Sequence, residues 1–182
     1  MSNIAVIYKS IYGSTKKYAQ WIAEEAKADC FECTEIETKK LMEYDTIIYG
    51  GGLYASGIAG ISIITKNFEI LKDKKLIVFT VGLASTDREE VFLPIIEKNF
   101  TKDMRDNIKF FHLRGGIDYK KLGIIHKSMM AMLKFIISRK SSNELSDDDK
   151  ELLATYGGKV DFTDKNTIRP LLLFLESPGG NI

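Results

Sequence analysis

Three hydroxyl side chains surround a single glycine near the start of the chain, where Ser10, Ser14 and Thr15 flank Gly13. Backbone N–H groups and hydroxyls in such a loop can donate hydrogen bonds to a phosphate, above all where a helix begins directly after the loop. The loop contains no lysine. Hydroxyls without a cation suit a single terminal phosphate that is bound without a metal ion. The residues therefore predict a mononucleotide site at this loop.

Other phosphate-binding loops have different patterns. A loop for nucleoside triphosphates reads Gly-x-x-x-x-Gly-Lys-Ser/Thr, and a loop for dinucleotides reads Gly-x-Gly-x-x-Gly; neither occurs in residues 10–15. A plain helix cap is the remaining alternative, with Ser14 or Thr15 capping the helix and Gly13 supplying the turn. A cap does not explain hydroxyls on both sides of the glycine directly after a strand, so we favour the phosphate site.

The run Ser10-Ile-Tyr-Gly-Ser-Thr15 resembles the phosphate loop of the flavodoxin family, written Ser/Thr-x-Thr/Tyr-Gly-Asn/Ser-Thr/Ser. The resemblance implies FMN as the cofactor. It also implies that the phosphate is held by Ser10, Ile11, Tyr12, Gly13, Ser14 and Thr15. Because the flavin carries the electrons or hydride, we expect no catalytic side chain and no metal ligand.

The elements that must position this loop alternate between strand and helix. Apolar runs predict strands at residues 3–9, 30–36, 45–50, 75–82 and 108–114. Helical patterns lie at 14–28, 61–71, 87–100, 118–140, 145–156 and 164–176, and a tail from Ser177 is expected to fray. This alternation predicts a doubly wound α/β sheet in a single domain, 1–182. The flavodoxin resemblance implies five parallel strands in the order 2-1-3-4-5.

Glycines cluster where three of these strands end, at Gly50–Gly52, Gly82 and Gly115–Gly116. Glycine lets backbone approach a planar ligand closely, although each cluster alone could be an ordinary turn. The resemblance implies that the flavin ring lies against Gly51, Gly52, Leu53, Tyr54, Val81, Gly82 and Leu83. Tyr54 is the aromatic residue of these loops, so the ring would be more open to a substrate than in a sealed carrier.

A long amphipathic stretch at 118–140 follows the fifth strand. Its apolar residues at helical spacing are Leu122, Ile125, Met129, Met132, Leu133, Ile136 and Ile137, and lysines and arginines crowd around them. With Arg114-Gly-Gly before it and methionines within it, this helical insertion resembles that of the menaquinone-dependent protoporphyrinogen dehydrogenases. That resemblance implies oxidation of a porphyrinogen, with electrons passed to a membrane quinone. The helix could pack on the domain, form a wall of the flavin pocket or lie on an anionic membrane.

Charge and composition narrow the function classes. The chain has 26 basic and 25 acidic residues and a net charge of +1, which gives no electrostatic argument for nucleic-acid binding. This charge also differs from that of the strongly acidic flavodoxins that shuttle electrons. No run approaches the roughly 20 apolar residues of a membrane span. We therefore expect a cytoplasmic protein, with peripheral membrane contact through 118–140 and a homodimer both left open.

Cysteines and histidines offer further candidates for chemistry. Cys30 and Cys33 form a Cys-x-x-Cys within a predicted strand, so we interpret them as reduced strand cysteines rather than a redox or zinc motif. His112 lies in the fifth strand and is interpreted as a hydrogen-bonded core residue. His126 lies on the insertion helix, where it could be exposed and could serve as a proton donor.

Together these patterns favour an FMN-dependent oxidoreductase that passes electrons between a small organic substrate and an acceptor such as a quinone or a redox partner. A one-electron carrier without its own substrate and a flavin-free scaffold domain are the two alternatives.

Overall fold

A parallel sheet forms the centre of the protein, and the computed structural model describes residues 3–87 and 89–177. The parallel strands are β1 (Ile4–Lys9), β2 (Asp29–Glu32), β3 (Thr46–Tyr54), β5 (Lys75–Gly82) and β6 (Ile108–Arg114). They pair in the order β2-β1-β3-β5-β6. This confirms the predicted doubly wound α/β fold with strand order 2-1-3-4-5. A short strand, β4 (Gly57–Ile58), pairs antiparallel with the end of β3.

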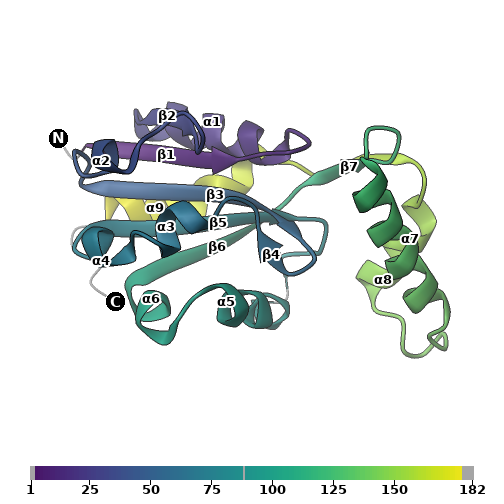
Figure 1. The fold of residues 1–182 in the computed structure, drawn as a ribbon. Coiled ribbons are helices and arrows are strands. Elements are labelled where there is room, and N and C mark those ends of the chain that lie inside the picture. Colours follow the sequence, from purple (N-terminus) through teal and green to yellow (C-terminus); the bar gives the residue numbers. More distant parts are fainter. Residues whose placement is uncertain (1–2, 88, 178–182) are drawn as a thin grey trace.

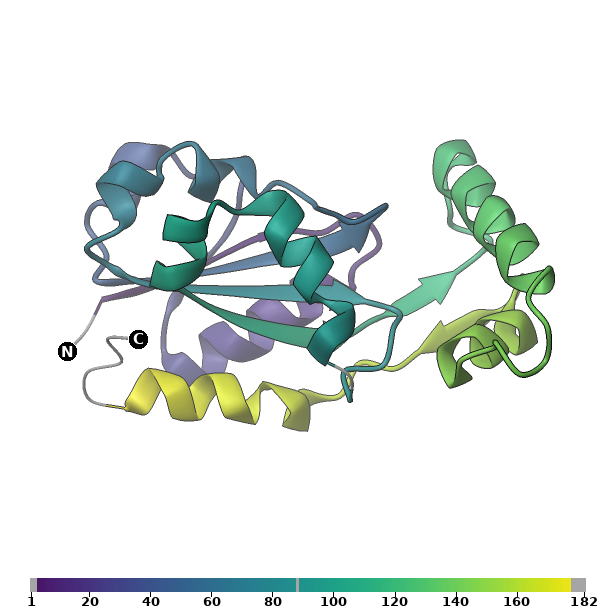
Figure 2. The same ribbon diagram turned by 90° about the horizontal axis from the view of Figure 1, so that it is seen from below.

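Helices cover both faces of the sheet (Figures 1 and 2). One face carries α1 (Ser14–Ala26) and α9 (Arg169–Glu176), the latter preceded by a 3-10 turn at Lys165–Ile168. The other face carries α2 (Thr38–Leu41), α3 (Ser62–Thr65), α4 (Phe68–Leu71), α5 (Leu93–Asn99), which follows a 3-10 turn at Glu89–Val91, and α6 (Lys102–Asn107). Because side chains alternate along a strand, β1 sends Val6 toward α1 and Ile7 toward the opposite core.

Several predicted boundaries were wrong. Strand β2 ends at Glu32, so Cys33 lies just beyond it. The third strand does not open into a loop at Gly50 but continues to Tyr54, where β4 still pairs with it. The predicted helix 61–71 is two short helices, since the Asn67 side chain donates a hydrogen bond to the Ile63 carbonyl (2.8 Å) where α3 ends. The helix expected at 87–100 begins at Leu93, and α6 was not predicted.

A separate structural unit projects beyond the carboxyl ends of the strands, at the right of Figure 1. It contains β7 (Gly116–Asp118), α7 (Ile124–Ser138), α8 (Asp147–Thr155) and β8 (Lys159–Asp161). We call residues 116–161 the arm. Strands β7 and β8 pair antiparallel with Ile117 opposite Val160, so the chain enters and leaves the arm side by side.

The structure of the arm differs from the predicted helix at 118–140. Residue 118 ends a strand, and the helix begins six residues later at Ile124, with Gly123 as its N-cap. The acidic run after it forms α8, whose capping box joins Ser146 and Asp149. Among the described residues no helix is both long enough and apolar enough to cross a membrane. The tail beyond Ser177 lies outside those residues, so its predicted fraying is not addressed by the structure.

Candidate functional site

A cavity of about 710 Å³ lies between the carboxyl end of the sheet and the arm. The core supplies one wall from the loop after β1 and from the carboxyl ends of β3, β5 and β6. Helices α7 and α8 supply the other wall. Ligands of doubly wound sheets bind at this edge, so the cavity is the candidate site.

The loop between β1 and α1 has the geometry of an anion site. Gly13 is the N-cap of α1 and has a left-handed backbone (φ 102°), and its N–H donates to the Ser10 hydroxyl (3.1 Å). Ser14 and Thr15 already lie in the first turn of α1, so the interpretation of either as the helix cap is wrong. The first N–H groups of a helix have no partner within the helix. With the hydroxyls of Ser10, Ser14 and Thr15, which line the cavity, they form a donor set suited to phosphate.

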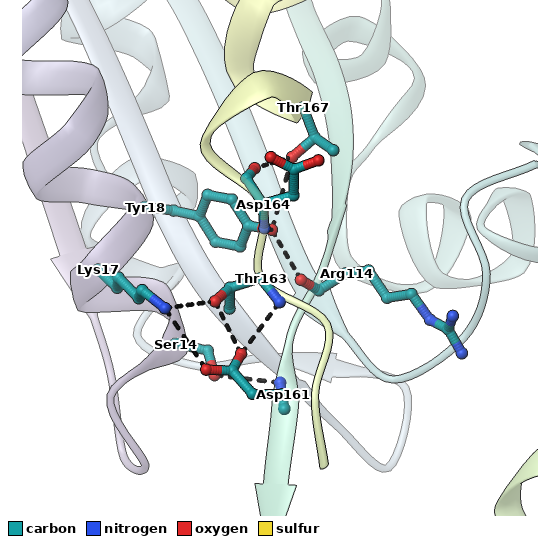
Figure 3. A network of polar contacts seen from close by, with 9 residues as sticks. Ser14, Lys17, Tyr18, Arg114, Asp161, Thr163, Asp164 and Thr167 are labelled. Atoms are coloured by element: carbon teal, nitrogen blue, oxygen red, sulfur yellow. Dashed lines mark hydrogen bonds and ion pairs between the residues drawn. The ribbon is translucent and has the colours of Figure 1, made fainter.

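Lys17, in α1 just after this loop, already has polar partners (Figure 3). The Lys17 ammonium donates to the Thr163 hydroxyl (2.6 Å) and contacts Asp161 (3.4 Å), which lies at the end of the arm. Hydrogen bonds from Thr163 lower the pKa of Asp161, so this carboxylate stays charged opposite the lysine. An anion in the loop would therefore be held by hydroxyls and N–H groups, as the sequence suggested.

Most of the predicted cofactor residues come together at the cavity. The cavity is lined by Ser10, Tyr12, Ser14, Thr15, Gly52, Leu53, Tyr54, Val81, Gly82 and Leu83. Ile11 is exposed, Gly13 caps the helix, and Gly51 is buried, so these three do not line it. Contact of all these residues with FMN stays a prediction.

The glycines of β3 make room for neighbouring side chains, and not in the first place for a ligand. A Cβ on Gly50 would lie 2.1 Å from the Phe79 ring, and one on Gly51 would lie 2.4 Å from Ile58. At Gly52, which lines the cavity, the space is taken by the Tyr54 ring at 2.8 Å. Gly52 is therefore the one of these three glycines at which a planar ligand could lie, if the Tyr54 ring moved aside.

Residues at the end of β6 belong to the site but were not predicted in it. A Cβ on Gly115 would lie 2.8 Å from Val81 and 3.4 Å from the Ser14 Cβ, so glycine is needed where β6 passes between them. Arg114 donates to the Leu83 carbonyl (3.0 Å), pairs with Glu151 of α8 and lies 3.8 Å over Phe162. The Arg114-Gly-Gly motif was the available signal.

Aromatic rings from the core and the arm meet at the mouth of the phosphate loop. The Tyr12 hydroxyl lies 2.5 Å from His126 Nδ1 and accepts a hydrogen bond from the Gly123 N–H (3.2 Å). The His126 ring also stacks on Tyr54, with ring centroids 4.8 Å apart. The ring of His126 is therefore partly buried between two tyrosines rather than fully exposed. Burial raises the pKa of Tyr54 to about 12, so Tyr54 stays neutral.

Helix α7 does not pack its apolar face on the domain. Ile124, Ile125 and Met132 are 85%, 74% and 66% exposed, whereas Ile137 is 3% exposed. The interpretation of α7 as an ordinary packed helix is thus wrong. The side chains that α7 turns to the cavity are His126, Met129, Met130, Met132, Leu133, Ile136 and Ile137.

The remaining candidates have structural roles. His112 bonds the Thr80 hydroxyl (2.7 Å) and stacks on Phe92 (3.9 Å), and burial lowers its pKa to about 4. The prediction of a hydrogen-bonded strand histidine is confirmed. Cys30 and Cys33 are not joined in a disulfide, and burial raises the pKa of both thiols, which makes them poor nucleophiles.

The flavodoxin domain matches residues 5–144 of this sequence. The chain belongs to the flavodoxin domain family. Family membership supports FMN binding, and the donor set fits that cofactor, with hydroxyls and a helix N-terminus for the phosphate and apolar walls for the ring. Among curated proteins, this flavodoxin-domain chain is 32% identical over 107 residues to the uncharacterized protein MJ0298 of Methanocaldococcus jannaschii. That match covers 57% of this chain and 64% of the relative, so it spans less than two thirds of the relative's length.

Solved structures show weaker similarity. The Trp repressor binding protein of Bacillus subtilis is 17% identical, with 62% of this chain and 83% of that chain covered and a TM-score of 0.47. A WrbA-like flavodoxin of Agrobacterium tumefaciens is 22% identical, with coverages of 54% and 73% and a TM-score of 0.40. The family assignment rests on the domain match alone.

Proposed function

We propose that this flavodoxin-domain protein is an FMN-dependent oxidoreductase that binds an apolar organic substrate between the flavin loops and α7. The observation that carries the proposal is the wall of Met129, Met130 and Met132, which lies across the cavity from the loops of β3 and β5. A carrier that exchanges electrons at its surface needs no such wall. FMN, when bound, supplies the hydride or electron chemistry.

The side chains of this chain would bind and orient the two molecules. Ser10, Ser14 and Thr15 would hold the phosphate, and Tyr54 would lie beside the ring. Methionine adapts to irregular apolar shapes, so the α7 wall suits a flat, largely apolar molecule. The arm would keep water from the reacting atoms, which strengthens polar interactions inside the cavity.

A quinone or a porphyrinogen is the substrate class that we propose. The quinone ring is planar, both molecules are built largely from apolar rings, and the insertion resembles that of the protoporphyrinogen dehydrogenases. The near-neutral net charge of +1 is a further argument against a role limited to carrying electrons to basic partners.

We also propose that the start of α7 contacts an anionic membrane, from which such a substrate would be drawn. Ile124 and Ile125 are 85% and 74% exposed. The exposed Lys120, Lys121 and Lys127 flank this pair in the sequence. Aliphatic side chains between lysines suit the interface of an anionic bilayer.

Reoxidation of the reduced protein by two acceptors tests the oxidoreductase proposal. The protein is loaded with FMN, reduced, and mixed with a water-soluble benzoquinone or with ferricyanide. Replacing Met129→Gln and Met132→Gln should raise the KM for the quinone about tenfold or more through lost apolar contact, and leave the ferricyanide rate unchanged. Met42→Gln is the matched control, since Met42 is 48% exposed and does not line the cavity. Equal quinone kinetics in all variants would favour the one-electron carrier, and protein that takes up no FMN would favour the scaffold.

A further inference from the structure

We infer that His126 is the proton-transfer residue of this site, held in place by Tyr12 and Tyr54. The inference rests on the proposed function and assigns a role to a side chain that neither the family nor the cofactor requires. The proposed unit is the hydrogen-bonded pair of Tyr12 and His126, which joins the phosphate loop to the arm.

The position of the imidazole is set by contacts with two tyrosines. Nδ1 lies 2.5 Å from the Tyr12 hydroxyl. That hydroxyl accepts the Gly123 N–H (3.2 Å), which lies three residues before His126 at the start of the same helix. Tyr54 stacks on the ring face with the planes 20° apart. Because Nδ1 is engaged with Tyr12, Nε2 is the ring nitrogen left for a substrate in the cavity that His126 lines.

Other ionisable groups of the cavity already have partners. Arg114 pairs with Glu151, Asp149 pairs with Lys140 (2.7 Å), and Asp148 accepts the Ser85 N–H (3.0 Å). Tyr54 has a pKa of about 12 and stays protonated. The charged neighbour on the same helix is Lys127, which is exposed. Histidine is the side chain that ordinarily gains and loses a proton near neutral pH, so His126 is the cavity residue suited to this work.

The chemistry of the proposed substrate requires such a group. Reducing a quinone to a hydroquinone adds two electrons and two protons. FMN, when bound and reduced, would supply both electrons and one of the protons as a hydride. The imidazolium of His126 supplies the second proton from Nε2 to a quinone oxygen and becomes neutral. In the opposite direction, neutral His126 takes the proton of an N–H or O–H group as the substrate loses its hydride.

Rapid mixing of FMN-loaded, prereduced protein with benzoquinone or ferricyanide between pH 5 and 9 tests this role. Ferricyanide takes one electron and no proton, so it reports everything except proton delivery. For the wild type, the quinone rate should fall as pH rises through one ionisation. At saturating FMN, His126→Gln should lower the quinone rate at pH 6 about 100-fold and remove that pH dependence, with a much smaller effect on the ferricyanide rate. Tyr12→Phe should lower the quinone rate less than His126→Gln does, because the imidazole remains and loses only its partner at Nδ1.

Imidazole NMR of the wild type provides a readout that needs no turnover. In Tyr12→Phe the imidazole resonances of His126 should shift, because Nδ1 loses its hydroxyl partner, whereas those of His112, which bonds Thr80, should not. A quinone rate in His126→Gln that keeps the wild-type pH profile would overturn the inference. Equal loss with both acceptors would also overturn it, since it would show a structural role. Wild-type protein that binds FMN but ignores quinones refutes the proposed function, whereas a normal quinone rate in His126→Gln refutes the proton role alone.

Discussion

The hydroxyl of Ser14 accepts a hydrogen bond from the backbone N–H of Gly116, 102 residues further along the chain, at 3.2 Å. Ser14 opens the helix that follows the phosphate loop, and Gly116 opens the arm. The same side chain therefore belongs to the anion site and holds the first residue of the cavity's outer wall. Changes at the phosphate loop are consequently expected to reach the arm.

Removing the loop hydroxyls should weaken FMN binding. In the double variant Ser14→Ala and Thr15→Ala the phosphate loses two charge-assisted hydrogen bonds, so the dissociation constant should rise about 100-fold or more. Quenching of flavin fluorescence measures it. Riboflavin lacks the phosphate, so its affinity should change little. A similar loss for riboflavin would mean that the hydroxyls act through the arm. Ser62→Ala with Thr65→Ala, on α3, is the matched control.

Adding a side chain at Gly115 should destabilise the protein. A serine Cβ there would lie 2.8 Å from Val81, and the neighbouring strands would have to shift. We expect Gly115→Ser to lower the free energy of unfolding by about 1–3 kcal/mol, measured by urea denaturation. At Gly123 the nearest atom lies 3.9 Å from a Cβ, and serine is a good N-cap. Gly123→Ser should therefore be neutral or stabilising. Equal effects at both positions would contradict the close approach at Gly115.

Arg114 should hold α8 against the core. Arg114→Ala removes the bonds to the Leu83 carbonyl and Glu151 and the contact with Phe162. Amide hydrogen exchange across Asp147–Thr155 should become at least several-fold faster, while the central strands stay protected. Lys150→Ala breaks an ion pair with fully exposed Asp147 and should leave the exchange unchanged. Unaltered exchange in Arg114→Ala would show that the arm is held elsewhere.

Mild acid should destabilise the protein through His112. The folded state keeps this imidazole neutral down to its pKa of about 4, whereas the reference value for histidine is 6.5. Between these values the unfolded chain binds more protons, so stability falls as pH drops from 6.5 toward 4. The loss is about 2 kcal/mol after allowing for partial exposure of the ring. His112→Gln should flatten this part of the profile in urea unfolding at pH 7 and 5. An unchanged slope would assign the effect to other groups.

Vesicle binding tests the proposed membrane contact. Wild-type protein should sediment with vesicles that contain phosphatidylglycerol and stay in solution with pure phosphatidylcholine. Ile124→Ser with Ile125→Ser should abolish sedimentation, because two aliphatic side chains leave the interface. Leu173→Ser is a control on α9, where the side chain is 54% exposed. Sedimentation that the isoleucine variant retains would refute contact through this end of α7.

The central strands were predictable because each is a nearly continuous apolar run, whereas their order was implied by the resemblance to the flavodoxin family. The phosphate loop was predictable because its donors are neighbours in sequence. The arm was not, since β7 and β8 are three-residue strands whose pairing joins residues about 40 positions apart and leaves no periodicity. The contact of Tyr12 with His126 spans 114 residues and depends on that pairing. The prediction that the β3 glycines make room for a ligand was incomplete, because Gly50 and Gly51 make room for the side chains of Phe79 and Ile58, which come from other segments.

The two ends of the arm lie together, since the Phe162 N–H donates to the Gly115 carbonyl (3.2 Å). A short turn could join these residues and leave every strand and helix of the core in place. Under the proposed function, substrate choice and cofactor binding would thus be encoded in separable stretches of one gene. Such an arrangement would allow recombination to exchange the arm between related proteins, and so change the substrate specificity while the residues of the flavin site stay the same.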